Sequence, residues 1–219
     1  MVASKALFFT AISIAFILSL FSPPPVQAKQ ENNDLMSFAI LGALGSFGLA
    51  CYQGKAPCSF EPNINTDALT FSMDIGADRT TEQSRISLGA DWKEPVYDTE
   101  SWQVVGRLES SLQKWWSTLD NPQNSEGYIL GITPVFHYQP KHMAFTPFIE
   151  MGGGPYLLSN IVIENEYKST QFQFGSIFGL GIKHKQLEVS YRYLHISNAG
   201  IEMPNPGTDF HSLHFAYSF

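Results

Sequence analysis

The sequence predicts an all-β fold, an eight-stranded antiparallel transmembrane β-barrel of the bacterial outer membrane. The first observation is a period-two alternation of apolar and polar residues through most of the chain after residue 67, typical of strands with one apolar face. The second is composition: 14% aromatic and 15% charged residues favour strands over long helices. The third is that the polar face carries charges of both signs, which is unusual for the water-facing side of a soluble sheet.

Residues 1–28 are predicted to be a signal peptide and are excluded from the fold. Lys5 supplies a basic start, "LFFTAISIAFILSLF" an apolar core, and "SPPPVQA" a small-residue cleavage site after Ala28. The apolar core is short for a membrane-spanning helix. The mature chain therefore begins at residue 29 and belongs to an exported protein.

Residues 29–66 form an N-terminal extension whose structure the sequence leaves open. The stretch "LMSFAILGALGSFGLACY" is apolar and glycine-rich, and could be a helix, a plug or a second translation start with its own signal. Cys51 and Cys58 are the two cysteines of the chain, and an oxidising compartment favours a disulfide between them. Two unpaired thiols remain the alternative.

Residues 67–219 are predicted to form the barrel, from eight segments with alternating faces. In the first of them Phe71, Met73 and Ile75 share one face, while Ser72 and Asp74 share the other. The segments are 68–78, 85–93, 101–113, 126–139, 144–158, 171–183, 186–197 and 209–219.

The apolar face is predicted to point outward, toward lipid. It is large and aromatic, whereas the opposite face carries Asp74, Asp91, Arg107, Glu109, Glu150, Glu188 and Arg192. A barrel with an apolar exterior and a polar interior explains this distribution, and closure leaves no unpaired strand edge in the membrane. With eight strands, side chains fill the interior, so no open pore is expected.

The connections and the C-terminus agree with an outer-membrane barrel. The predicted connections at one end of the barrel are on average longer than those at the other end, as in bacterial outer-membrane barrels. The longer set lies near 79–84, 113–126, 157–170 and 198–208, and the shorter set near 94–100, 139–143 and 183–186. The last strand alternates apolar residues and ends on the aromatic Phe219, which resembles the assembly signal of outer-membrane barrel proteins.

The charge of the chain excludes one large class of partners. The net charge is −7, and the signal peptide carries one lysine and no acidic residue, so the mature chain is more acidic still. Nucleic acid binding requires a basic face for the phosphates, and none is expected here. The sequence contains no metal-binding cluster pattern, and no cofactor is expected.

Three residues with catalytic chemistry fall on the predicted lipid-facing side. His195 and Ser197 are two apart on the seventh segment, so their side chains share a face about 7 Å apart at the α-carbons. Asp209 has the outward parity of the eighth segment. A base, a nucleophile and an orienting acid form a nucleophilic triad, with the backbone near Asn198 and Gly200 as oxyanion donors. His-x-Ser is a common pair, and a histidine in the aromatic belt of the barrel is the alternative interpretation.

The motif "HISNAG", followed by "NPGTDF" and the aromatic C-terminus, resembles the outer-membrane lipid A 3-O-deacylase (PagL-like) family. The resemblance implies an eight-stranded outer-membrane barrel that hydrolyses the ester-linked 3-position acyl chain of lipid A, the lipid of lipopolysaccharide. It implies His195 as base, Ser197 as nucleophile, Asp209 as acid, and Asn198 with Gly200 as the oxyanion hole. The better-known members carry glutamate where this chain has Asp209.

Two other functions remain open at the level of sequence. A non-catalytic barrel, acting as an anchor or adhesin, would keep the alternation without needing Ser197. An acyltransferase would pass the acyl group to another membrane lipid rather than to water. Whether the barrel forms a homodimer is also undecided by the sequence.

Overall fold

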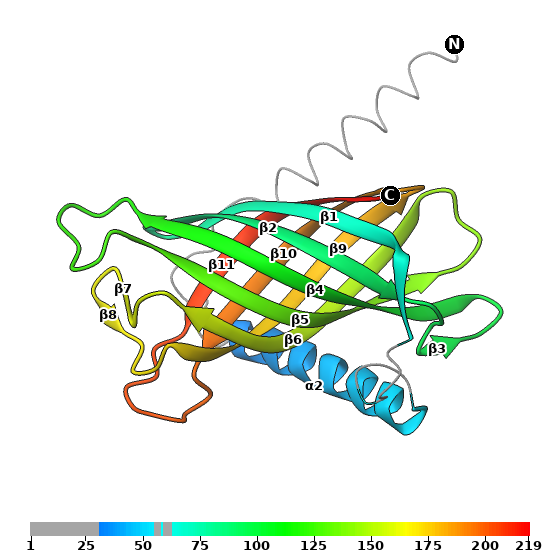
Figure 1. Cartoon of the computed structure of the whole chain (residues 1–219), viewed down its shortest axis with the longest axis horizontal. Coiled ribbons are helices and arrows are strands. Elements are labelled where there is room, and N and C mark those ends of the chain that lie inside the picture. Colours follow the sequence, from blue (N-terminus) through cyan, green and yellow to red (C-terminus); the bar gives the residue numbers. More distant parts are fainter. Residues whose placement is uncertain (1–30, 55–57, 59–62) are drawn as a thin grey trace, which may run out of the picture. The chain divides into compact units, whose positions relative to one another are not determined.

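The computed structural model describes residues 31–54, 58 and 63–219, so the predicted signal peptide lies outside the described residues. Within the compact unit 36–219, eight long strands form a closed antiparallel barrel (Figure 1). The sheet order is β2-β1-β11-β10-β9-β6-β5-β4-β3, and pairing of β2 with β4 closes it.

The long strands match the eight predicted segments and extend several of them. Their bounds are β1 (Ile64–Asp78), β2 (Thr81–Trp92), β4 (Trp102–Ser117), β5 (Glu126–Pro140), β6 (Thr146–Leu158), β9 (Phe172–His184), β10 (Leu187–Ser197) and β11 (Thr208–Ser218). Three short strands lie in the connections: β3 (Tyr97–Asp98), β7 (Val162–Ile163) and β8 (Glu166–Tyr167).

The largest differences from the prediction are extensions of four residues, at the start of β1 (residue 64 rather than 68), at the end of β4 (residue 117 rather than 113) and at the start of β2. Strand β2 begins at Thr81 rather than at residue 85, because residues 81–84 pair with β1 on one side and with β4 on the other. These four residues, "TEQS", have no apolar face, so periodicity could not find them. Backbone pairing continues where the apolar alternation has ended.

The faces of the barrel are as predicted, with apolar residues outside and polar residues inside. In β1, Phe71 and Ile75 are exposed, whereas Ser72 and Asp74 are buried. The interior holds an ion-pair network: Arg192 binds Glu109 and Glu150. Further pairs join Arg107 to Glu188, Arg85 to Asp74 and Arg85 to Glu109. Paired charges therefore fill the middle of the barrel.

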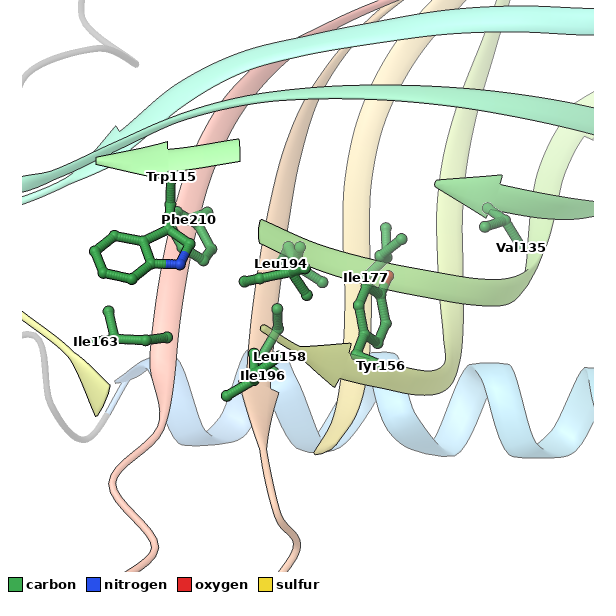
Figure 2. Packing of buried hydrophobic residues seen from close by; sticks show 10 residues of the cluster. Trp115, Val135, Tyr156, Leu158, Ile163, Ile177, Leu194, Ile196 and Phe210 are labelled. Carbon is green, nitrogen blue, oxygen red and sulfur yellow. The ribbon is translucent and has the colours of Figure 1, made fainter. Parts of the chain in front are cut away.

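A second interior layer is apolar and backs the wall formed by β10 and β11 (Figure 2). Leu194 and Ile196 of β10 pack there with Phe210 of β11, and all three are buried. Since side chains alternate along a strand, the odd-numbered residues of this part of β10 point outward. This packing holds the outward-facing positions 193, 195 and 197 on a rigid wall.

The N-terminal extension contains a helix, α2 (Glu31–Tyr52). From Met36 on, this helix belongs to the same compact unit as the barrel. Ala43 packs with Met151, Ala50 packs with Phe136, and Ser46 hydrogen-bonds to the Tyr138 hydroxyl group. A disulfide bond joins Cys51, in the last turn of the helix, to Cys58 beyond its end. No helix among the described residues is long and apolar enough to cross a membrane.

Candidate active site on the outer face of β10 and β11

The strand register brings His195 and Asp209 together. They are directly paired across β10 and β11, and Nδ1 of His195 lies 2.6 Å from Oδ1 of Asp209. Their side chains are 29% and 33% exposed, so they lie on the outside of the barrel. A carboxylate on Nδ1 requires that nitrogen to carry the ring proton, which leaves Nε2 as the basic nitrogen.

Asp209 receives a second hydrogen bond that the sequence analysis missed. The hydroxyl group of Tyr193 donates to the same Oδ1 at 2.8 Å. The Tyr193 ring stacks on His211 with centroids 4.9 Å apart, and His211 is hydrogen-bonded to Tyr191. Tyr193 is two residues before His195 and shares its face, so parity was the signal that could have pointed to it.

Ser197 is the last residue of β10, partly exposed, and lies opposite Phe174 of β9. Its hydroxyl group makes no hydrogen bond within the described residues, and none joins it to His195. Ser197 has no pairing partner on β11, because the register there begins at Ile196 and Thr208. The hydroxyl group is therefore at the point where the wall of the barrel opens into the loop 198–207.

Asn198 and Gly200, the predicted oxyanion donors, already use their donors, within the loop and, for Nδ2 of Asn198, also to the Lys168 carbonyl. The Asn198 backbone N–H donates to Oδ1 of Asn205 at 2.9 Å, and its side-chain Nδ2 donates to the Glu202 carbonyl at 2.7 Å. The Gly200 N–H donates to Oδ1 of Asn198 at 2.8 Å. Asn198 thus organises the loop here. Donation to an oxyanion would require these bonds to exchange or to be shared.

Two further residues lie around the site: Gly207, which is part of the motif "NPGTDF" but received no role from the sequence, and Lys168, which the sequence did not indicate. Gly207 lies against the imidazole: a Cβ atom there would come within 2.4 Å of Cε1 of His195. Lys168, from the connection between β8 and β9, is buried and donates to the Gly207 carbonyl at 3.1 Å. Contacts from a distant loop leave no local pattern in the sequence.

The arrangement provides a partly exposed serine two residues from a histidine whose Nδ1 is held by a carboxylate. These are the elements of nucleophilic catalysis, placed on the outer face of the barrel. Among the described residues, no group of three or more histidine, cysteine, aspartate or glutamate side chains is arranged to hold a metal ion.

Comparison with known proteins identifies the family. The model of the lipid A 3-O-deacylase (PagL) family matches residues 83–218. The chain belongs to this family. The matched region contains all three predicted triad residues. Of the helices and strands that the structure describes, α2, β1 and the first residues of β2 lie outside it.

Relatives and a solved structure agree with that membership. The chain is 26% identical to the lipid A deacylase PagL of Pseudomonas aeruginosa over 83% of this chain and 96% of that protein. It is 32% identical to the PagL of Bordetella bronchiseptica over 52% of this chain and 65% of that protein. A crystal structure of the outer membrane enzyme PagL matches with a TM-score of 0.61 and 25% identity, covering 68% of this chain and 98% of that one. This member of the PagL family is an outer-membrane β-barrel enzyme.

Proposed function

We propose that this protein removes the ester-linked 3-position acyl chain of lipid A, with Ser197 as nucleophile, His195 as general base and Asp209 as orienting acid. The observation that carries the proposal is the 2.6 Å contact between His195 and Asp209 on the outside of the barrel, two residues from Ser197. The family to which the chain belongs is described by the same reaction.

The chemistry proceeds in two displacements. Oγ of Ser197 attacks the ester carbonyl carbon while Nε2 of His195 takes its proton. The tetrahedral intermediate then expels the 3-hydroxyl oxygen of the sugar, which receives that proton, and an acyl-serine remains. Water, deprotonated by His195, attacks the acyl-serine, and the fatty acid leaves as Ser197 recovers its hydrogen. Asp209 stabilises the imidazolium in both steps.

The oxyanion formed in each step requires hydrogen-bond donors. We assign Asn198 and Gly200 to this role, with their loop hydrogen bonds exchanging when substrate binds. Ala199 lies between them with a positive φ of 53°, and its N–H group makes no hydrogen bond within the described residues. It is the donor in this turn that is not already engaged.

The position of the triad on the outer wall suits a substrate that is itself a membrane lipid. A catalytic group facing lipid is costly for a protein with a soluble substrate. Here the ester reaches the site by lateral movement in the membrane leaflet, without leaving it. Ion pairs fill the interior of the barrel, and lateral access from the membrane requires no route through it.

Mass spectrometry of lipid A tests the proposal against both alternatives. Cells that express the protein should contain lipid A lacking one 3-position acyl chain, together with free fatty acid. Cells that express Ser197→Ala should contain intact lipid A. An acyltransferase would instead transfer the missing chain to a second lipid. Intact lipid A with the wild-type protein, also in detergent that exposes the substrate, would indicate a non-catalytic barrel.

A further inference from the structure

Lys168 is a buried cation just outside the proposed triad. It follows β8 in the connection to β9, and its side chain is only 2% exposed. Its Nζ donates to Oε2 of Glu166 at 2.7 Å, to the Gly207 carbonyl at 3.1 Å and to the Pro206 carbonyl at 3.2 Å. An ammonium group has three donors, so this environment satisfies all of them.

The same residue also contacts the other end of the β10–β11 loop. The Lys168 carbonyl accepts a hydrogen bond from Nδ2 of Asn198 at 3.3 Å. Asn198 is fully buried and directly follows Ser197. The next residue, Ser169, donates from its hydroxyl group to the Pro204 carbonyl at 2.6 Å. One short segment therefore holds the loop at its first residue and near its last.

The last residue of that loop, Gly207, lies against the imidazole ring of His195. A Cβ atom on Gly207 would lie 2.4 Å from Cε1 and 3.1 Å from Nε2 of His195, so the Gly207 backbone abuts the ring. Cε1 lies between the two ring nitrogens, and Nδ1 would be 3.3 Å from the same Cβ position, so the contact is with the end of the ring that carries both nitrogens. Movement of Gly207 would therefore allow the imidazole to turn away from Ser197.

We propose that Lys168 is a positioning residue for this reaction: by binding the Pro206 and Gly207 carbonyls it holds the loop against His195. The proposal rests on the proposed function, because it assigns Lys168 a role through His195. Lys168 does not contact substrate, since all its donors are used and its side chain is buried.

The carbonyl contacts carry this role, and the ion pair with Glu166 does not. The Glu166 side chain is 60% exposed, and a pair with one partner in water contributes little. The two carbonyls, in contrast, would lose their charged donor if Lys168 were replaced by an apolar residue. Buried polar groups without partners are costly, so the loop would shift.

Steady-state kinetics on the refolded full-length enzyme in detergent, with lipid A as substrate, test the proposal. Lys168→Met should lower kcat about 10- to 100-fold and leave KM nearly unchanged, since a small misplacement of a catalytic group has effects of this size. Lys168→Arg, which keeps charged donors, should recover part of the loss. Glu166→Gln should stay close to wild type.

Lys141→Met is the matched control. Lys141 also binds a carboxylate and a backbone carbonyl, those of Asp98 and Thr99, but in the connection after β5. Its kcat should be unchanged. Each variant should keep the different gel mobility of folded and boiled protein, which verifies barrel assembly. Hydrogen exchange in residues 198–207 should accelerate in Lys168→Met, independently of activity.

The outcomes separate this inference from the proposed function. An active wild type and an inactive Ser197→Ala, with wild-type kcat and exchange in Lys168→Met, would overturn the positioning role alone. Equal kcat losses in Lys168→Met and Lys141→Met would also overturn it, since they would indicate a general loss of stability. An inactive wild type, or an active Ser197→Ala, would overturn the proposed function first.

Discussion

The barrel contains two histidine–aspartate pairs that differ in their surroundings. Inside, Nδ1 of His214 lies 3.0 Å from Oδ1 of Asp74, and both side chains are 1% exposed. Outside, His195 and Asp209 are joined at 2.6 Å and about a third exposed. The same contact occurs in both places, so the pair alone does not mark the proposed site; what differs is access from outside and a neighbouring hydroxyl group that is not already hydrogen-bonded.

The inner pair belongs to the structural ion network. Asp74 also faces Arg85 and Arg192, at 3.5 Å and 3.8 Å. In a closed, low-dielectric interior these charges must compensate one another, so each partner contributes to assembly of the barrel. In the part of the chain that the structure describes, no lysine or arginine forms an ion pair with Asp209, and its second donor is the neutral hydroxyl group of Tyr193. It is arranged to orient a ring next to a hydroxyl group.

The largest effect is expected at Ser197, which is partly exposed and whose hydroxyl group makes no hydrogen bond within the described residues. The serines beside the inner pair, Ser190 and Ser212, are in contrast buried and hydrogen-bonded. Ser197→Ala should lower kcat on the order of 10³-fold or more, because the nucleophile is lost. His195→Ala should lose a similar amount, and the double variant little more, since the two residues act as one unit. Deacylation of lipid A by the folded variants provides the measurement. Additive losses in the double variant would contradict a shared mechanism.

Asp209→Asn should have the next largest effect. The amide keeps the shape but removes the charge that stabilises the imidazolium, so kcat should fall about 100-fold or more. Asp209→Glu should retain substantial activity, because it keeps the carboxylate. The measurement is kcat for lipid A deacylation by both variants and by the wild type. If Asp209→Asn is fully active, the acid lies elsewhere, and Glu202 in the adjacent loop is the next residue to test.

A smaller effect is expected for Tyr193→Phe, which removes one of two donors to Asp209. A hydrogen bond to a charged group contributes about 1.5–3 kcal/mol, and part of it should appear as a decrease of about 3- to 10-fold in kcat. Tyr217→Phe is the matched control, since this tyrosine is exposed on the same outer face of β11. Equal rates for Tyr193→Phe and the control would show that the hydroxyl group does not position the acid.

The smallest effect on turnover is expected for Asp74→Asn, in the inner pair. Removing one charge from a buried network should destabilise the barrel by about 3–5 kcal/mol. The kcat of the molecules that remain folded should stay at the wild-type value. Unfolding in urea, monitored by gel mobility, measures the loss of stability. Steady-state kinetics measure kcat. A kcat loss as large as that of Asp209→Asn would remove the distinction between the two pairs.

What the sequence determined by itself was the direction of side chains along each strand. Parity is local, so eight segments, an apolar exterior and the outward position of His195 and Ser197 could be predicted, and the fold prediction was confirmed. Even β2, which begins four residues earlier than predicted, keeps the predicted faces.

Only the tertiary structure decided which of these residues meet. The 2.6 Å contact of His195 with Asp209 depends on the register of β10 and β11. Lys168 lies two strands before the loop that it contacts, with β9 and β10 between them. Asn198 uses its donors in a turn whose geometry no sequence pattern indicates. Such contacts join residues far apart in the chain, and they form only when closure of the barrel brings the strands and loops together.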